Sequence, residues 1–117
     1  MEFARLFTPY EAAKTLPLVR RIVEDILQTA ERYRSLEEDA AEREGLAEVI
    51  EEHLEELEEI GCFYKDWNYS VGLVDFPARI DGEIVFLCWR SDESKLSFYH
   101  RIEDGYAGRR PIPRDSP

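Results

Sequence analysis

Three side chains in the second half of the chain have the chemistry of a nucleophilic catalyst: Cys88, His100 and Asp75. In such a triad a thiolate attacks, a histidine takes its proton, and a carboxylate orients the histidine. Their spacing matches no nucleophile elbow or known cysteine-hydrolase motif. The strand pattern described below also directs Cys88 and His100 to opposite faces of a sheet. We therefore favour a half-buried cysteine in a central strand over a catalytic thiol.

The same residue types raise the question of a metal site. Cys62, Cys88, His53 and His100 are of the types that bind zinc. Zinc sites usually contain ligand pairs roughly two to four residues apart, and these four residues form no such pair. The sequence therefore assigns no metal ligand and no cofactor. It leaves open a site of histidine and carboxylates assembled from several segments.

Alternating apolar and polar residues predict the strands that carry these side chains. Asp81-Gly82 lies between two apolar runs and predicts a two-residue hairpin turn. This turn pairs Ile80 with Glu83 and fixes the register of the first hairpin. The predicted elements form an antiparallel meander of three or four strands: a short strand around Cys62–Lys65, then strands at about 73–80, 83–90 and 95–102.

The register of the last strand decides which side chains share a face. A loop of four residues, 91–94, pairs Arg90 with Lys95 and therefore Val85 with His100. His100 then points to the apolar face that we expect to pack on helices. The opposite face carries one row across three strands: Asp75, Cys88 and Ser97.

The first half of the chain is helical. Thr8, Pro9 and Glu11 are a helix start with a capping box, and Pro17 predicts a kink or break in the helix. We expect a short helix at about 9–15, a long helix at about 17–42, a turn at Gly45, and a second helix at about 46–60.

The predicted architecture is a single α+β domain over residues 1–117. An antiparallel helical hairpin (8–61) packs on the β-meander (62–102), and an irregular tail (103–117) follows. The helices and the second sheet face both have apolar side chains left over, and we expect a partner subunit, the C-terminal tail or a ligand to cover part of that face. We therefore expect a homo-oligomer, with a dimer favoured.

The charge of the chain is negative and unevenly distributed. The net charge is -11; residues 1–60 have seven Lys/Arg against 17 Asp/Glu, and residues 61–117 have eight against nine. An acidic helical surface of this kind repels nucleic-acid phosphates and anionic membranes, so we expect neither as a partner.

Other features of the composition concern the compartment and stability. No apolar run approaches the roughly 20 residues that span a bilayer, and the first residues do not have the pattern of a signal peptide. Two cysteines without C-x-x-C spacing suggest free thiols, so we expect a cytoplasmic protein. A single Gln, Asn and Met beside abundant Glu and Arg resembles a thermophile composition and predicts a high melting temperature.

Several sequence motifs resemble a known family. G-L-V-D-F-P-A-R, D-G-E, L-C-W-R, a later histidine and D-G-Y-A-G-R-R, with F-T-P-Y-E-A near the start, resemble the uncharacterised domain of unknown function 2203. The resemblance covers nearly the whole chain. It departs at Asp92-Glu93, where members commonly have Gly-Glu, and at Tyr99-His100, where they have Trp-His. It implies no mechanism, but it implies a polar site at seven positions: Lys65, Asp66, Asp75, Arg90, Glu93, His100 and Arg109.

These observations leave three expectations for function. The first is a cytoplasmic interaction or assembly module that forms a homo-oligomer, and a further protein partner is compatible with it. The second is a small-ligand or enzymatic site, and the third is a metal-binding protein. The residues expected to line a site of the second kind are Asp75, Arg90, Glu93, His100 and Arg109.

Overall fold

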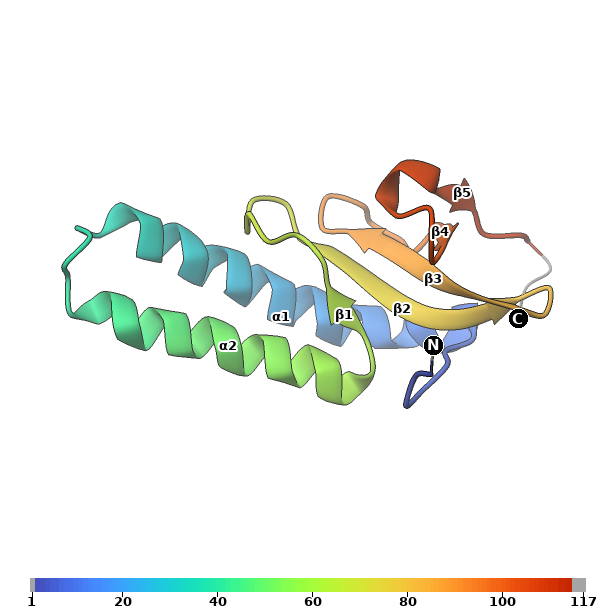
Figure 1. Cartoon of the computed structure of the whole chain (residues 1–117), viewed down its shortest axis with the longest axis horizontal. Coiled ribbons are helices and arrows are strands. Elements are labelled where there is room, and N and C mark those ends of the chain that lie inside the picture. The colour runs from blue at the N-terminus through green and yellow to red at the C-terminus, as the bar shows by residue number, and fades with distance from the viewer. Residues whose placement is uncertain (1, 115–117) are drawn as a thin grey trace.

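The computed structural model, which describes residues 2–114, is an α+β protein in which a helical hairpin packs on a β-meander (Figure 1). The sheet is antiparallel, its strands neighbour one another in chain order, and the molecule measures 51 × 25 × 25 Å. The fold class is therefore as predicted. The elements are α1 (Pro9–Ser35), α2 (Glu42–Ile60), β1 (Phe63–Tyr64), β2 (Leu73–Ile80), β3 (Glu83–Arg90), β4 (Phe98–Arg101), the short 3-10 helix η1 (Tyr106–Gly108) and β5 (Arg110–Pro111).

Helix α1 begins at the predicted capping box but is not broken at Pro17. The Glu11 N–H donates to Thr8 Oγ1 at 3.1 Å, and the Thr8 N–H donates to Glu11 Oε1 at 2.9 Å. Pro17 lies inside a continuous helix, so the predicted break is wrong. Pro17 and Ala13, the residue whose carbonyl loses its helical partner, are both exposed, and water can hydrate that carbonyl.

The connection between the helices lies earlier in the chain than predicted. Helix α1 ends at Ser35 rather than near residue 42, and α2 begins at Glu42, so Gly45 is helical and does not form the turn. Acidic residues in the first turn of α2 favour a helix N-terminus there. The C-terminal end was predicted correctly, because Gly61 adopts φ 108° and its N–H reaches the carbonyls of Leu57 and Glu58.

The first hairpin has the predicted register, and the second does not. Ile80 pairs with Glu83 as expected. Strand β4, however, pairs Phe86 with His100 and Val85 with Arg101, one residue away from the predicted alignment. The loop after β3 runs over residues 91–97 rather than 91–94. A slip of one residue exchanges the two faces of a strand, so every side chain of β4 lies on the face opposite to that predicted.

A turn organised by Glu93 accounts for this register. Its carboxylate oxygen Oε1 accepts from the Arg90 N–H at 2.8 Å, and its carbonyl accepts from Trp89 Nε1 at 2.9 Å. The Glu93 N–H in turn donates to the Arg90 carbonyl at 2.8 Å. These bonds close a compact turn directly after β3, so the chain reaches β4 only at Phe98. Ser97 lies before the strand, outside the predicted row.

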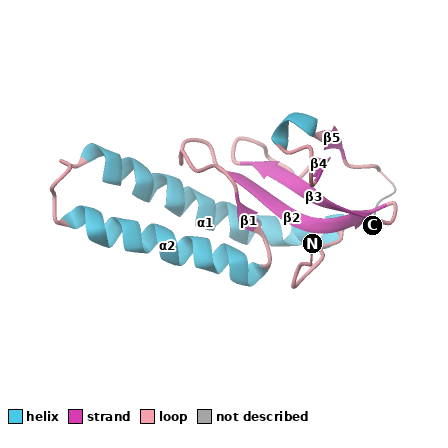
Figure 2. Ribbon diagram, viewed as in Figure 1, coloured by secondary structure: helices cyan, strands magenta, loops and turns pink. Residues whose placement is uncertain are grey.

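The two faces of the sheet have different surroundings. The inner face packs on α1 and forms the main core, with Val74, Phe76, Leu87 and Trp89 fully buried. Figure 2 shows the helices extending past one end of the sheet. The outer face carries Asp75, Phe86, Cys88 and His100. It is the face on which the candidate site lies.

Segments from both ends of the chain cover parts of the outer face. Phe3 contacts the rings of Phe63 and Phe86, with centroids 5.9 and 5.5 Å away. The tail, predicted to be irregular, forms η1 and adds β5 to the sheet beside β4. Its end, residues 115–117, lies outside the described residues. Within residues 2–114, no helix combines the length and the apolar character that crossing a membrane requires.

Candidate functional site

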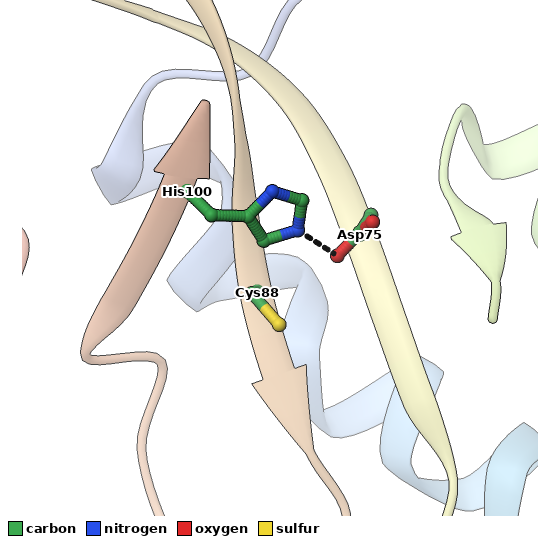
Figure 3. Close-up of side chains that lie close together, drawn as sticks. All are labelled: Asp75, Cys88 and His100. Carbon is green, nitrogen blue, oxygen red and sulfur yellow. Dashed lines mark hydrogen bonds and ion pairs between the residues drawn. The ribbon is translucent and has the colours of Figure 1, made fainter. Parts of the chain in front are cut away.

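Asp75, Cys88 and His100 come together on the outer face, each from a different strand of the sheet (Figure 3). Asp75 and Cys88 are cross-strand partners on β2 and β3, and His100 lies on β4 opposite Phe86. One ligand-type atom from each residue lies within 4.8 Å of the others, and the three residues are only 2–4% exposed. The prediction that Cys88 and His100 point to opposite faces is therefore wrong, because it used the shifted register of β4.

The imidazole of His100 is held from both sides. Its Nδ1 lies 2.8 Å from the Arg101 carbonyl, and its Nε2 lies 3.3 Å from Asp75 Oδ1. Because a carbonyl oxygen only accepts, Nδ1 carries the hydrogen. The bond to Asp75 raises the pKa of His100, while burial acts in the opposite direction. Nε2 is therefore the nitrogen that binds a proton, or another electrophile, inside the site.

Cys88 does not have the properties of an activated nucleophile. Burial, with a contribution from the Asp75 charge, raises the pKa of the Cys88 thiol to about 12. His100 is bonded to Asp75 and not to the thiol, as Figure 3 shows. Without a further cation the thiol is neutral at physiological pH, and a neutral thiol attacks poorly. The site instead presents three different donor atoms, sulfur, nitrogen and oxygen, at short range.

A pocket of about 280 Å³ opens over these three residues. Apolar side chains from the sheet and its flanks form much of the wall, and the tail contributes Gly105 and Tyr106. Lys65 is exposed at the rim, with Nζ 5.4 Å from the centroid of the Phe86 ring. The lining residues are Lys65, Leu73, Asp75, Phe86, Cys88, His100, Ile102, Gly105 and Tyr106.

Arg109, Glu93 and Arg90 form a second polar cluster that holds the tail on the sheet. Arg109 Nη2 donates to Glu93 Oε1 at 2.6 Å and to the Cys88 carbonyl at 3.1 Å. Arg90 Nη1 donates to the Tyr106 hydroxyl at 2.9 Å. The guanidinium of Arg109 also lies over the ring of Tyr106, 4.8 Å from its centroid. These residues position a wall of the pocket and lie outside its lining.

Asp66 has a different role from the other predicted site residues. Its Oδ2 accepts from the N–H groups of Ser70, Val71 and Gly72 at 2.8–3.0 Å, and its Oδ1 accepts from Asn68 at 3.2 Å. Burial alone raises the pKa of Asp66, but these donors outweigh it and hold the pKa below its usual range. The carboxylate is used to order the loop between β1 and β2.

The seven predicted residues therefore separate into four groups. Asp75 and His100 lie at the centre of the site, and Lys65 lies at the rim of the pocket. Asp66 orders the loop between β1 and β2. The three residues that hold the tail on the sheet are Arg90, Glu93 and Arg109. Sequence reasoning excluded Cys88 through the wrong register, and it did not anticipate Tyr106. The D-G-Y-A-G segment was the available signal, because Gly105 adopts φ 65° and turns Tyr106 back over the sheet.

The fold and the site define a small α+β protein with a buried carboxylate, thiol and imidazole on one face of its sheet. The chain belongs to the family of uncharacterized conserved proteins DUF2203, which matches residues 5–112. This agrees with the resemblance found in the sequence motifs. No curated protein and no solved structure gives a significant match to the chain.

Proposed function

We propose that the protein binds a divalent transition-metal ion of the zinc class through Asp75, Cys88 and His100. The observation that carries the proposal is the convergence of three buried donor atoms within 4.8 Å of one another, from three adjacent strands. Thiolate, imidazole and carboxylate together form a donor set that zinc and its neighbours accept. The ion would also supply the positive charge that a thiolate needs, and a coordinating thiol is deprotonated outright.

The surroundings of His100 support the same proposal. Histidines that bind metals usually donate their second ring nitrogen to a carbonyl or carboxylate, which fixes the tautomer and the ring orientation. The Nδ1 bond of His100 to the Arg101 carbonyl has this form. It leaves the Nε2 lone pair directed toward Asp75 when the ring is neutral. Arg109 restrains the backbone at Cys88 through the bond to its carbonyl.

Three protein ligands leave one position of a tetrahedral ion unfilled. Structural zinc sites are usually closed by four protein ligands, whereas sites with three bind water or a substrate in the fourth position. In this protein the open position would face the pocket. The proposal therefore favours a reversible ligand site or a metal-assisted reaction over a purely structural ion.

Cobalt substitution tests the proposal with matched controls inside the chain. We expect metal-stripped protein to bind Co(II) in equimolar amount and to develop a thiolate-to-cobalt charge-transfer absorption. Cys88→Ala and His100→Gln should lose this absorption or the affinity. Cys62→Ala and His53→Gln should retain both, because Cys62 lies in the core and His53 pairs with Glu56 on α2. No equimolar binding, or equal losses in the control variants, would refute the metal site.

A second candidate function is assembly of two copies through the helical hairpin. An apolar groove of about 500 Å³ lies between α1 and α2 and includes Tyr33, Ile50 and Leu54. Arg34 and Glu51 also line it, and a two-fold axis that passes midway between them would place Arg34 of one copy beside Glu51 of the other. This self-complementary charge pattern supports a homodimer.

Sedimentation separates this second candidate from a monomer. We expect a dimer at micromolar concentration that Ile50→Glu dissociates, while Leu18→Glu, at an exposed position on the same hairpin, leaves it intact. A monomeric unmodified protein would refute the dimer.

For the compartment we propose the cytoplasm, which the two free and buried cysteines, Cys62 and Cys88, support.

A further inference from the structure

We infer that the pocket beside the proposed metal site takes a small monocarboxylate with an apolar body, whose carboxylate oxygen fills the open coordination position. The inference rests on the proposed metal site and adds the chemical class of its ligand. It follows from the charge, the wall composition and the size of the pocket.

The charge of the loaded pocket favours one negative charge. The Asp75 carboxylate and the Cys88 thiolate together neutralise a divalent ion, and His100 then binds as a neutral ligand. Lys65 remains as a positive group at the rim. Within residues 2–114, no carboxylate lies at ion-pair distance from the Lys65 ammonium. One uncompensated positive charge over a neutral metal site is complementary to a monoanion.

The walls of the pocket favour a carboxylate over a phosphate. Phosphate sites use guanidinium groups, helix N-termini or nests of backbone N–H groups to spread more than one negative charge. None of the described lining residues is an arginine, and Arg90 and Arg109 are already engaged outside the pocket. A carboxylate needs only one metal contact and one ammonium contact.

The remaining lining residues favour an apolar body on the ligand. Leu73, Phe86 and Ile102 offer hydrocarbon surface around the polar floor, and Tyr106 closes one side from the tail. The pocket volume of about 280 Å³ lies just below the roughly 300–1,000 Å³ typical of sites for drug-sized molecules, so it suits a smaller ligand. A short aliphatic acid or a single aromatic acid has the required size and polarity.

The test uses the full chain loaded with Co(II), so that metal binding and ligand binding are read separately. The charge-transfer absorption before any ligand is added reports the metal. Butyrate, hexanoate and benzoate are then added, and changes in the cobalt ligand-field bands together with calorimetry report the ligand. Hexanol, hexylamine and inorganic phosphate are the comparison compounds.

We expect the three carboxylates to change the cobalt bands and the comparison compounds to leave them unchanged. Lys65→Gln should weaken carboxylate binding by about tenfold or more, because it removes a charge-assisted contact. Lys14→Gln, which removes an equal charge from α1, should not weaken it. If metal binds but hexanoate and hexanol behave alike, or phosphate binds more tightly, the ligand inference fails and the metal site stands. If no metal binds, both fail.

Discussion

Asp66→Asn is a demanding test of how the loop between β1 and β2 is held. The side chain of Asn has nearly the same size, but it has no charge and only one acceptor oxygen. In the structure the two oxygens of Asp66 accept four backbone N–H groups, three on Oδ2 and one on Oδ1. The side-chain carbonyl of the asparagine can still accept from the three N–H groups that Oδ2 now binds. Its NH₂ group then faces the Asn68 N–H, and that bond is lost.

The magnitude follows from these bonds. A hydrogen bond to a charged group contributes about 1.5–3 kcal/mol and a neutral one about 1 kcal/mol, so each of the three retained bonds weakens by roughly 0.5 kcal/mol or more. The lost bond adds about 1 kcal/mol rather than the full value for a charged acceptor, because Asn68 is exposed and water can replace the carboxylate at its N–H. Partial exposure of Asp66 reduces this sum through solvent screening. We expect Asp66→Asn to lower the free energy of unfolding by about 2 kcal/mol at neutral pH.

The same carboxylate predicts a pH dependence with a defined sign. The pKa of Asp66 is lowered in the folded state, so its stabilisation is present above the pKa of the unfolded state, about 3.9. It is lost as the pH falls through the folded pKa, because the unfolded chain then binds the proton more strongly. The difference between the two proteins should therefore stay constant near neutral pH and shrink below about pH 4.

Urea denaturation at a series of pH values measures this difference, and the fluorescence of Trp67 and Trp89 is the probe. Asp39→Asn removes an equal charge from the exposed connection between the helices and serves as the control. A loss below about 0.5 kcal/mol at neutral pH would show that the four N–H groups do not depend on the carboxylate. A loss of about 2 kcal/mol that persists undiminished at about pH 3 would refute the electrostatic explanation.

Three further predictions concern the tail, the core thiol and the whole chain. Arg109→Gln should lower the free energy of unfolding by about 2–3 kcal/mol, because it breaks the mostly buried pair with Glu93. The exposed Arg110→Gln should change it by less than about 0.5 kcal/mol. Urea denaturation measures both variants, and equal effects would contradict the role of Arg109 in holding the tail on the sheet. Burial raises the pKa of Cys62 to about 12. In a Cys88→Ala background, iodoacetamide at about pH 8 should therefore modify Cys62 at least about a thousandfold more slowly in the folded protein than in the unfolded chain. Mass spectrometry measures the two rates, and equal rates would contradict this prediction. The composition predicts a thermal midpoint above the ordinary range of about 45–65 °C, which calorimetry tests and a midpoint inside that range would contradict.

The features predicted correctly from the sequence are those set by neighbouring residues. The capping box of Thr8 and Glu11, the left-handed stop at Gly61 and the turn at Asp81-Gly82 each depend on a few adjacent positions. The turn alone fixed eight cross-strand pairs between β2 and β3. The helical hairpin and the meander followed from the change in hydrophobic period, which is also a local signal.

The predictions were wrong where contacts between residues far apart in the sequence determine the structure. The length of the loop after β3 depends on Glu93, whose carboxylate is shared between the Arg90 N–H and Arg109 from the tail. No short-range pattern reveals that contact. Pro17 interrupts no packing because its position on α1 faces solvent. The position of His100, and with it the whole site, depends on the loop that Glu93 organises.

The site therefore depends on whether the loop between β3 and β4, residues 91–97, has an odd or an even number of residues. Adding or removing a single residue within 91–97, where it shifts the pairing of β4 by one residue, would turn Tyr99 toward Asp75 and Cys88 and His100 toward the helices, while the β2–β3 hairpin kept its pairing. A change of two residues would restore the imidazole to the same face. Members of the family whose loops differ by an odd number of residues should differ in their chemistry even where all three donor residues are present. Loop length, which costs little in stability, is thus a switch between two chemically different versions of one fold.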